Sequence, residues 1–382
     1  MNFELSEEQR LLQKSVRDFC EQAIIPNARK WDEEETFPHE LIPPMGELGL
    51  LGMQVAEEFG GAGMKFHDYV VALEEVARAD ASVGLTMASH NSLCTGHINL
   101  AATDDQRRRY LPRLASGKVL GGWGLTEPGS GSDAGAARAR AERRGDKWII
   151  NGTKTFITQG SVGGIYVVLA STAPEKKAKG LTAFIIERGT PGFRTGRKIE
   201  KMGLRASDTT ELVMEDVELP DDQRLGEINH GFFDTLKILD RGRIGIGAWA
   251  VGIGRAALEA SRRYAKERVQ FGKAIAEFQA IQMMLADMAT ELDAARLLVW
   301  RAAFLQDRKQ RTTLESSEAK YFAARASMRA CNNAIQIHGG YGYTREFDVE
   351  RYLRDAKLAE IGEGTNEVQK MVIAREILKD LG

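Results

Sequence analysis

One glutamate near the end of the chain stands between two glycines, in the stretch EIGEGTNEV at residues 360–368. Because glycine carries no side chain, another molecule can come close to the backbone and the carboxylate of Glu363. Thr365 precedes an apolar helical pattern, where threonine is a typical helix cap. The stretch therefore marks Glu363 as a candidate for chemistry, although the local pattern by itself leaves its role open.

A glycine-rich stretch, GLTEPGSGSDAGA at residues 124–136, has four glycines and three hydroxyl residues. Backbone N–H groups and hydroxyl groups in such a turn suit an anion or the polar edge of a flat ring. A solvated loop is the alternative. Phe156 and Thr158 follow in a probable strand and share one face of it because side chains alternate. The Phe156 ring could stack on a bound ring or belong to the core.

Charged residues in the second half of the chain give weaker indications. Asp240 and Arg243 are neighbours on a probable helix, which usually means a surface ion pair. Arg268 and Phe271 lie between two helical patterns, where they are available for phosphate and ring contacts or are merely solvated. His338 has no second His, Cys or acid at ligand spacing, so we expect a helix end and no metal site.

The motif GIGRAA at residues 252–257 is similar to a dinucleotide-binding fingerprint, but its context is wrong. No strand precedes it, and a helix runs through it. We therefore interpret its small residues as contact points between closely packed helices.

The bulk composition excludes several classes of protein. The chain has 382 residues, a formal charge of −2 and 43% hydrophobic residues, so a basic nucleic-acid-binding surface is not expected. Three scattered cysteines favour a reducing compartment over a disulfide framework. The acidic start is unlike a signal peptide, and the apolar run 244–254 is shorter than the roughly 18 residues that span a membrane. The sequence predicts a cytoplasmic protein without a membrane span.

The order of elements follows from the prolines and the apolar periodicity. All nine prolines lie at or before Pro220, so long helices can fill the rest of the chain. Ser6 and Gln9 form a capping box at the start of the first helical pattern. A helical stripe with spacings of three and four predicts one long helix in the second half. Its residues are Ile281, Leu285, Met288, Leu292, Ala295, Val299 and Ala302.

Between the helical regions the pattern changes to strands. The pair Asn151-Gly152, flanked by β-forming residues, predicts a hairpin turn within an antiparallel sheet or barrel. Helices, then strands, then helices is not the alternation of a doubly wound fold. We predict a mostly α fold with a middle β domain, divided into residues 1–120, 121–225 and 226–382.

Several of these stretches together resemble the acyl-CoA dehydrogenase family. GLTEPGSGSDAGA is similar to its first signature, and QIHGGYGYTREFDVERYLRD at residues 336–355 to its second. NGTKTFIT, YAKERVQFGKAIAEFQAIQ and EGTNEVQKMVIAREIL match in the same order. The resemblance covers essentially the whole chain.

The resemblance implies a fold of three parts: an N-terminal α domain, a β barrel and a C-terminal four-helix bundle. It implies FAD as cofactor, commonly a homotetramer, and oxidation of an acyl-CoA thioester to the trans-2-enoyl-CoA, as in fatty acid beta-oxidation. Electrons then pass to an electron-transferring flavoprotein. The stretches LDRGR and FGGAG are most similar to short-chain members. We therefore expect a short-chain or branched short-chain substrate.

Carried over by position, Glu363 matches the catalytic base, and the flavin N5 takes the β-hydride. The resemblance implies substrate contacts at Ser132, Asp240, Arg243 and Gly364. It also implies FAD contacts, partly across a subunit interface, at Trp123, Leu125, Thr126, Gly131, Ser132, Phe156, Ile157, Thr158, Arg268, Phe271, Phe278, Gln279, Gln336, Ile337, Gly339, Gly340, Thr365, Asn366 and Glu367.

Two positions depart from the common family pattern, and a third bears on where the base lies. Many members carry Trp in place of Phe156, and many carry an aromatic residue in place of Gly362, which widens the expected acyl pocket. Some branched-chain members place the base at the position of Gly242, which cannot act here. Two other functions stay open: a flavin oxidase or monooxygenase on the same scaffold, and an acyl-CoA-binding protein that has lost its flavin.

Overall fold

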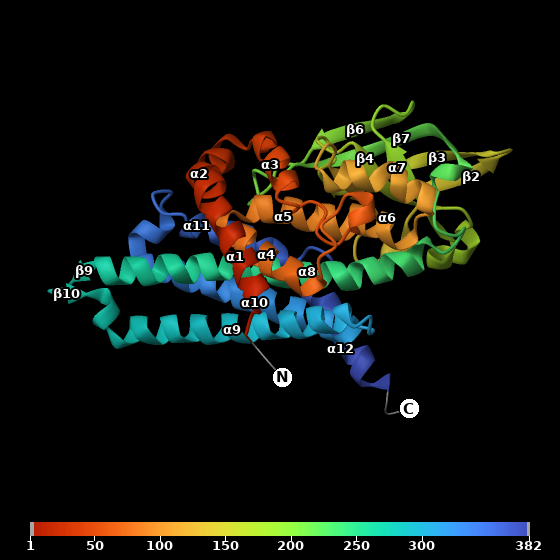
Figure 1. Cartoon of the computed structure of the whole chain (residues 1–382). Coiled ribbons are helices and arrows are strands. Elements are labelled where there is room, and N and C mark those ends of the chain that lie inside the picture. The colour runs from red at the N-terminus through yellow and green to blue at the C-terminus, as the bar shows by residue number, and fades with distance from the viewer. Residues whose placement is uncertain (1–3, 380–382) are drawn as a thin grey trace.

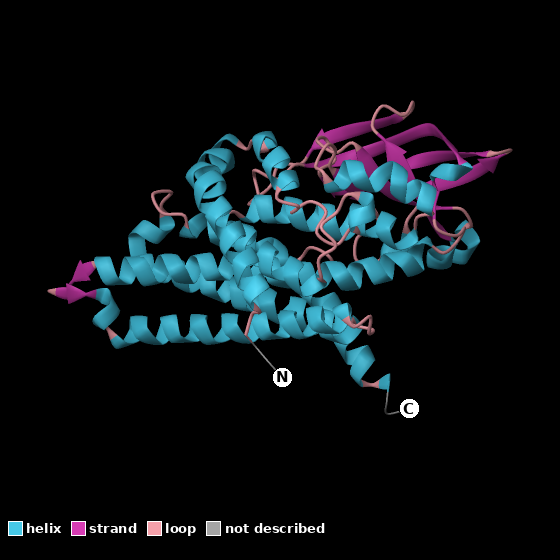
Figure 2. Cartoon of the chain, viewed as in Figure 1, coloured by secondary structure: helices cyan, strands magenta, loops and turns pink. Residues whose placement is uncertain are grey.

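The structure is a computed structural model and describes residues 4–379. Helices from both halves of the chain surround the long helix α8, and one sheet lies at a single side of the molecule (Figures 1 and 2). The predicted mostly α fold with a middle β domain is therefore confirmed. Within the described residues, no helix combines the length and the apolar character needed to cross a membrane.

The first part of the chain is helical, and α4 and α5 are almost wholly buried. The capping box is present, since Ser6 Oγ accepts from the Gln9 N–H at 3.2 Å and Gln9 Oε1 accepts from the Ser6 N–H at 3.1 Å. The helices of this part are α1 (Glu7–Phe19), α2 (Ile25–Glu34), α3 (Ile42–Glu47), α4 (Phe66–Ala79), α5 (Ala81–Ser89), α6 (Gly96–Ala101) and α7 (Asp104–Ala115).

The sheet has the strand order β6-β7-β3-β2-β4-β5-β8, and β1 also pairs with β4. Its pairs are antiparallel except β1–β4 and β2–β4, so the sheet is mixed and not purely antiparallel as predicted. The strands are β1 (Gly121–Gly124), β2 (Arg140–Arg144), β3 (Lys147–Thr158), β4 (Ile165–Ser171), β5 (Leu181–Glu187), β6 (Phe193–Lys198), β7 (Thr209–Pro220) and β8 (Arg224–Leu225).

The predicted hairpin at Asn151-Gly152 is wrong, because β3 runs straight through it. Instead, the register between β3 and β7 shifts between Ile150 and Gly152, which is a β-bulge. The Asn151 side chain secures the bulge by pairing with Asp216 of β7, with a donor–acceptor distance of 3.0 Å from Asn151 Nδ2 to Asp216 Oδ1. Pairing with β2 and β7 on both sides overrides the local turn signal. The chain turns earlier, at Gly145, between β2 and β3.

The last part of the chain is a bundle built on α8 (Gly231–Glu267). It also contains α9 (Gln279–Asp307), α10 (Thr313–His338), α11 (Val349–Ala356) and α12 (Asn366–Ile377). A hairpin of β9 (Val269–Gln270) and β10 (Lys273–Ala274) lies at the end of the bundle opposite α12 (Figure 1). The predicted stripe on α9 faces inward, with Met288, Leu292, Ala295, Val299 and Ala302 buried.

The small residues of the GIGRAA stretch serve helix packing, as the sequence indicated. A Cβ atom at Gly252 would lie 2.5 Å from the Glu74 carbonyl oxygen of α4. A Cβ atom at Gly254 would lie 2.4 Å from Leu292 Cδ2 of α9. These two glycines let α4 and α9 lie directly against α8, which fixes the helix that carries one wall of the cavity described next.

Candidate active site

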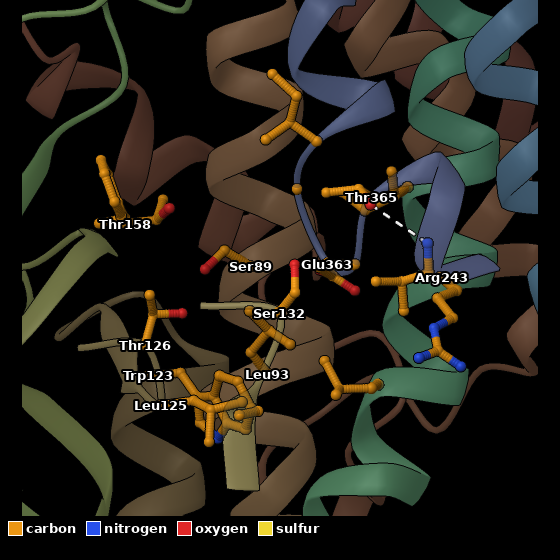
Figure 3. Close-up of a pocket in the computed structure, with 18 of the residues that line it drawn as sticks. Ser89, Leu93, Trp123, Leu125, Thr126, Ser132, Thr158, Arg243, Glu363 and Thr365 are labelled. Carbon is orange, nitrogen blue, oxygen red and sulfur yellow. Dashed lines mark hydrogen bonds between the residues drawn. The ribbon is translucent and has the colours of Figure 1, made fainter. Parts of the chain in front are cut away.

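A cavity of about 1590 Å³ lies where the N-terminal helices, the sheet and the bundle meet (Figure 3). Side chains from α5, β1, β3, α8 and α12 line it, and many of them are apolar. The apolar lining includes Leu85, Leu93, Leu100, Trp123, Leu125, Leu236, Leu239, Ile246 and Trp249. The volume exceeds the 300–1,000 Å³ usual for a single small ligand, so the cavity has room for two groups side by side.

Glu363 points into this cavity from the turn before α12 (Figure 3). Its Oε2 atom is buried and has no hydrogen-bond partner among residues 4–379. The backbone is left-handed at Glu363, with φ of 52°, and at Gly364, with φ of 93°. Gly364 is needed for that conformation, whereas Gly362 is not, and a Cβ atom there would make ordinary contact with Leu358 at 3.5 Å.

Gly242 of α8 lies directly behind the Glu363 carboxylate. A Cβ atom at this position would lie 2.0 Å from Glu363 Oε2 and 2.9 Å from its Cδ. Any side chain at 242 would therefore displace the carboxylate. The glycine that cannot act as a base is also the residue that makes room for the base at 363.

The electrostatics of the site centre on Glu363. Burial raises the pKa of its carboxyl to about 7, and the positive charges of Arg243 and Lys320 act in the opposite direction. Arg243 forms an ion pair with Asp240 at 3.0 Å, and Thr313 Oγ1 donates to Asp240 Oδ2 at 2.7 Å. Arg243 is buried, Asp240 is partly buried, and both line the cavity, so the surface pair suggested by the spacing alone does not apply.

The glycine-rich stretch forms another wall of the cavity, where Thr126, Gly131 and Ser132 lie with the apolar Trp123 and Leu125. Figure 3 shows Ser132 between Glu363 and the Trp123–Leu125 strand end. The stretch is therefore part of the site and not a solvated loop.

An ion pair below this wall holds the stretch in place. The Glu127 carboxylate accepts from Lys154 Nζ at 2.7 Å and from the backbone N–H groups of Arg138 and Ala139 at 2.6 and 2.9 Å. Lys154, fully buried, also donates to the Leu125 carbonyl oxygen at 3.1 Å. This pair was not predicted from the sequence. The available signal was a lysine inside a predicted strand, at the same alternation as the apolar Trp148 and Ile150.

The end of β3 forms the third wall, with Phe156, Ile157 and Thr158. Phe156 has φ of 57° and is 65% exposed, and the register with β7 shifts between Lys154 and Ile157. The bulge breaks the alternation on which the sequence analysis relied, so three successive residues line the cavity instead of two.

Several other residues that we predicted to contact FAD do not line this cavity. A hollow of about 480 Å³ near the β9–β10 hairpin is lined by Arg268, Ile337, Gly339 and Gly340. Phe271 lies at the hairpin tip, 94% exposed, and its ring is 6.0 Å from that of Phe278. Gln279 begins α9 and Gln336 lies near the end of α10. Within one chain, the residues predicted to contact FAD therefore lie partly at the Glu363 cavity and partly near the β9–β10 hairpin.

The residues that follow Glu363 belong to the first turn of α12. Thr365 caps the helix, since its Oγ1 accepts from the Val368 N–H at 3.3 Å. Asn366 is buried and Glu367 is exposed. Within residues 4–379, no group of three His, Cys, Asp or Glu side chains is arranged to bind a metal.

Comparison with known proteins identifies the family. The models of the N-terminal, middle and C-terminal domains of acyl-CoA dehydrogenase match residues 6–118, 122–217 and 229–378. The chain belongs to the acyl-CoA dehydrogenase family.

Relatives and solved structures agree along the whole length. The short-chain specific acyl-CoA dehydrogenase of Clostridium acetobutylicum is 44% identical, over 99% of this chain and 100% of that protein. Butyryl-CoA dehydrogenase of Megasphaera elsdenii has a TM-score of 0.97 at 42% identity, covering 99% and 100%. A chain in a structure of the electron transferring flavoprotein of Acidaminococcus fermentans has a TM-score of 0.98 at 42% identity, covering 100% of both.

The enzyme is an oxidoreductase with FAD as cofactor. The walls of the cavity fit a flavin ring. Hydroxyl groups of Thr126, Ser132 and Thr158 face the cavity and suit the polar ring edge, and the exposed Phe156 offers an aromatic face. The unpartnered Glu363 carboxylate opens to the same space.

Proposed function

We propose that this enzyme oxidises a short-chain or branched short-chain acyl-CoA to the trans-2-enoyl-CoA, with Glu363 as the base that removes the α-proton. The observation that carries the proposal is the Glu363 carboxylate, which is directed into the cavity and whose Oε2 atom is buried and unpartnered within residues 4–379. Carboxylates in such a position are costly to bury and are typical of functional sites.

The environment of Glu363 suits the removal of a weakly acidic proton. Desolvation raises the pKa of the carboxyl to about 7, which makes the ionised form a stronger base than an exposed glutamate and keeps much of it ionised near neutral pH. The Glu363 N–H has no acceptor among the described residues and is free to donate to the thioester carbonyl, where negative charge accumulates.

The other side of the substrate faces the FAD site. Bound FAD supplies flavin N5 as the acceptor of the hydride from the substrate Cβ. We propose that Thr126, Ser132, Phe156, Ile157 and Thr158 hold the ring system, because they line the wall of the same cavity. The chain's contribution is to hold base, substrate and ring in one stack, which demands rigid walls.

The remaining proposed FAD contacts require a second copy of the chain, so they are part of the proposed assembly. Arg268, Gly339 and Gly340 line a hollow at the far end of the bundle, so we assign them to the FAD of a neighbouring copy, with Phe271 and Phe278 nearby. The enzyme would then act as a homotetramer in the cytoplasm and pass electrons to an electron-transferring flavoprotein. We keep the division into residues 1–120, 121–225 and 226–382.

The substrate-contacting residues and the acyl group are the finer part of the proposal. Asp240, Arg243, Ser132 and Gly364 line the cavity around Glu363. The space left by Gly362 next to Leu358 accommodates a substituent on a short acyl chain. The names of the short-chain and butyryl-CoA relatives support the same class of substrate.

The decisive experiment replaces Glu363 by Gln with FAD bound. Loss of a general base lowers turnover by about 10²- to 10⁴-fold. Enoyl-CoA formation is assayed with an artificial electron acceptor and a panel of straight and branched acyl-CoA substrates. Near-normal turnover by E363Q would overturn the assignment of the base. Peroxide formation without an added acceptor would favour the oxidase function instead.

A further inference from the structure

Two buried side chains hold the turn that carries Glu363, and they come from different helices. Lys320 of α10 donates from Nζ to the Gly364 carbonyl oxygen at 2.7 Å. Gln369 of α12 donates from Nε2 to the same oxygen at 2.9 Å and to the Glu363 carbonyl oxygen at 3.3 Å. Both side chains are fully buried. The left-handed turn at 363 and 364 is therefore fastened through its carbonyl groups.

These hydrogen bonds to the turn do not require the charge of Lys320, because the neutral Gln369 side chain donates to the same Gly364 carbonyl oxygen. A buried ammonium is costly unless a negative group compensates it. Among the described residues, Lys320 has no carboxylate partner within salt-bridge distance, unlike the buried Lys154. Burial lowers its pKa to about 8, and Glu363 is the strongest of the charges that act in the opposite direction. Glu363 is thus its main electrostatic counterpart.

The other charges around Glu363 do not replace Lys320. Arg243 of α8 lowers the Glu363 pKa more than Lys320 does, but Arg243 also forms an ion pair with Asp240 at 3.0 Å. Tyr69 of α4 is buried, and burial together with Glu363 raises the pKa of its phenol, so it stays neutral. The surrounding groups on the later elements are Glu360, Glu367 and Arg375, which act on Lys320 or Arg243.

We infer that Lys320 is a positioning residue for the reaction: it fixes the turn of the catalytic base and places beside that turn a positive charge that has no carboxylate within salt-bridge distance among the described residues. The inference rests on the proposed role of Glu363. It assigns to α10 a part in the chemistry that the sequence analysis did not foresee.

The test compares two substitutions that distinguish the effect of the Lys320 charge from the effect of the hydrogen bonds to the turn. K320M removes the charge and the hydrogen bond while keeping the volume, and Q369L removes hydrogen bonds alone. The Glu363 carboxyl is titrated by infrared difference spectroscopy, with E363Q subtracted, and the pH profile of kcat is measured in parallel. We expect the Glu363 pKa to rise by about one unit in K320M, since Lys320 lowers this pKa and the loss of an opposite charge has an effect of this size.

A rise of about one unit moves the pH profile of K320M toward higher pH and lowers kcat about fivefold at pH 7. Q369L lowers kcat across the range and leaves the Glu363 pKa in place. The control K370M removes a positive charge from the exposed face of α12 and leaves both the pKa and the profile unchanged. If K320M does not fold, K320Q, which also lacks the charge, replaces it.

An unmoved Glu363 pKa in a folded K320M or K320Q variant would overturn the inference about Lys320. That outcome leaves the proposed function intact as long as E363Q is inactive. An active E363Q would instead remove the proposed function itself, whatever Lys320 does.

Discussion

Replacement of Gly242 by alanine tests how closely the base is fitted to α8. The new Cβ atom would lie 2.0 Å from Glu363 Oε2 and 3.1 Å from Oε1, whereas ordinary contact begins at 3.4 Å. The carboxylate must therefore withdraw by about 1.4 Å, since the helix backbone cannot move against α4, α9 and α10. Misplacement of a reacting group by about 1 Å costs roughly 100-fold in rate.

We expect G242A to lose about 100-fold in kcat/KM, which corresponds to about 2.7 kcal/mol of transition-state stabilisation. The fold should tolerate the change. Alanine gains about 1 kcal/mol of helix propensity over glycine, which offsets part of the crowding at the carboxylate. Enoyl-CoA formation gives the rate, denaturant unfolding gives the stability, and the flavin absorbance shows that FAD is bound.

The matched control is G245A, one turn further along α8. Its Cβ atom would lie 3.1 Å from the Tyr69 hydroxyl oxygen, and its three nearest atoms belong to Tyr69 and Leu73 and not to Glu363. It should keep kcat/KM within a few fold. Wild-type kcat/KM in G242A, with FAD bound, would refute the reasoning, because the carboxylate would then not occupy the space behind 242.

Three further predictions concern the cofactor and the stability of the fold. E127Q leaves the Lys154 ammonium buried without its partner, so the free energy of unfolding should fall by about 3 kcal/mol and FAD should bind more weakly. The double variant E127Q/K154M should recover part of the lost stability and part of the lost FAD affinity. If it recovers neither, the ion pair does not have this role. R268A should weaken FAD binding, measured by fluorescence titration, and should leave the Glu363 infrared band in place. His90 is neutral because burial lowers its pKa to about 4, so below pH 6.5 the unfolded chain binds a proton that the folded chain rejects. Stability therefore falls by up to about 3 kcal/mol as the pH drops from 6.5 to 4, and denaturant unfolding of H90Q should show a flatter pH dependence.

The periodic elements of the fold could be predicted from sequence because one signal governs each of them. The proline-free tail and the apolar stripe fixed α9, and the Ser6–Gln9 box fixed the start of α1. The Asn151-Gly152 turn failed because the partner strand β7, with Asp216, decides the local conformation and lies over sixty residues away. Local patterns cannot contain a contact of that kind.

The site shows the same division. The Glu363 stretch and the glycine-rich stretch are each a continuous run of residues, and the sequence predicted both as parts of the site. The roles of Lys320, Glu127 and Lys154 were not predicted. Lys320 and Lys154 are single charged residues inside a helix and a strand, and Glu127 lies in a glycine-rich loop; in all three places charge ordinarily indicates a solvated face. Only the three-dimensional neighbours reveal that they are buried.

In the proposed arrangement, the separation of the two hollows makes each copy of the enzyme dependent on another. A chain with Arg268 replaced keeps an intact Glu363 cavity, and a chain with Glu363 replaced keeps an intact hairpin hollow. If FAD lies between copies, two inactive proteins refolded together would restore active centres built from their undamaged ends. In a cell that makes both a normal and a substituted chain, a substitution in one chain would likewise inactivate a site that it shares with a neighbour of normal sequence.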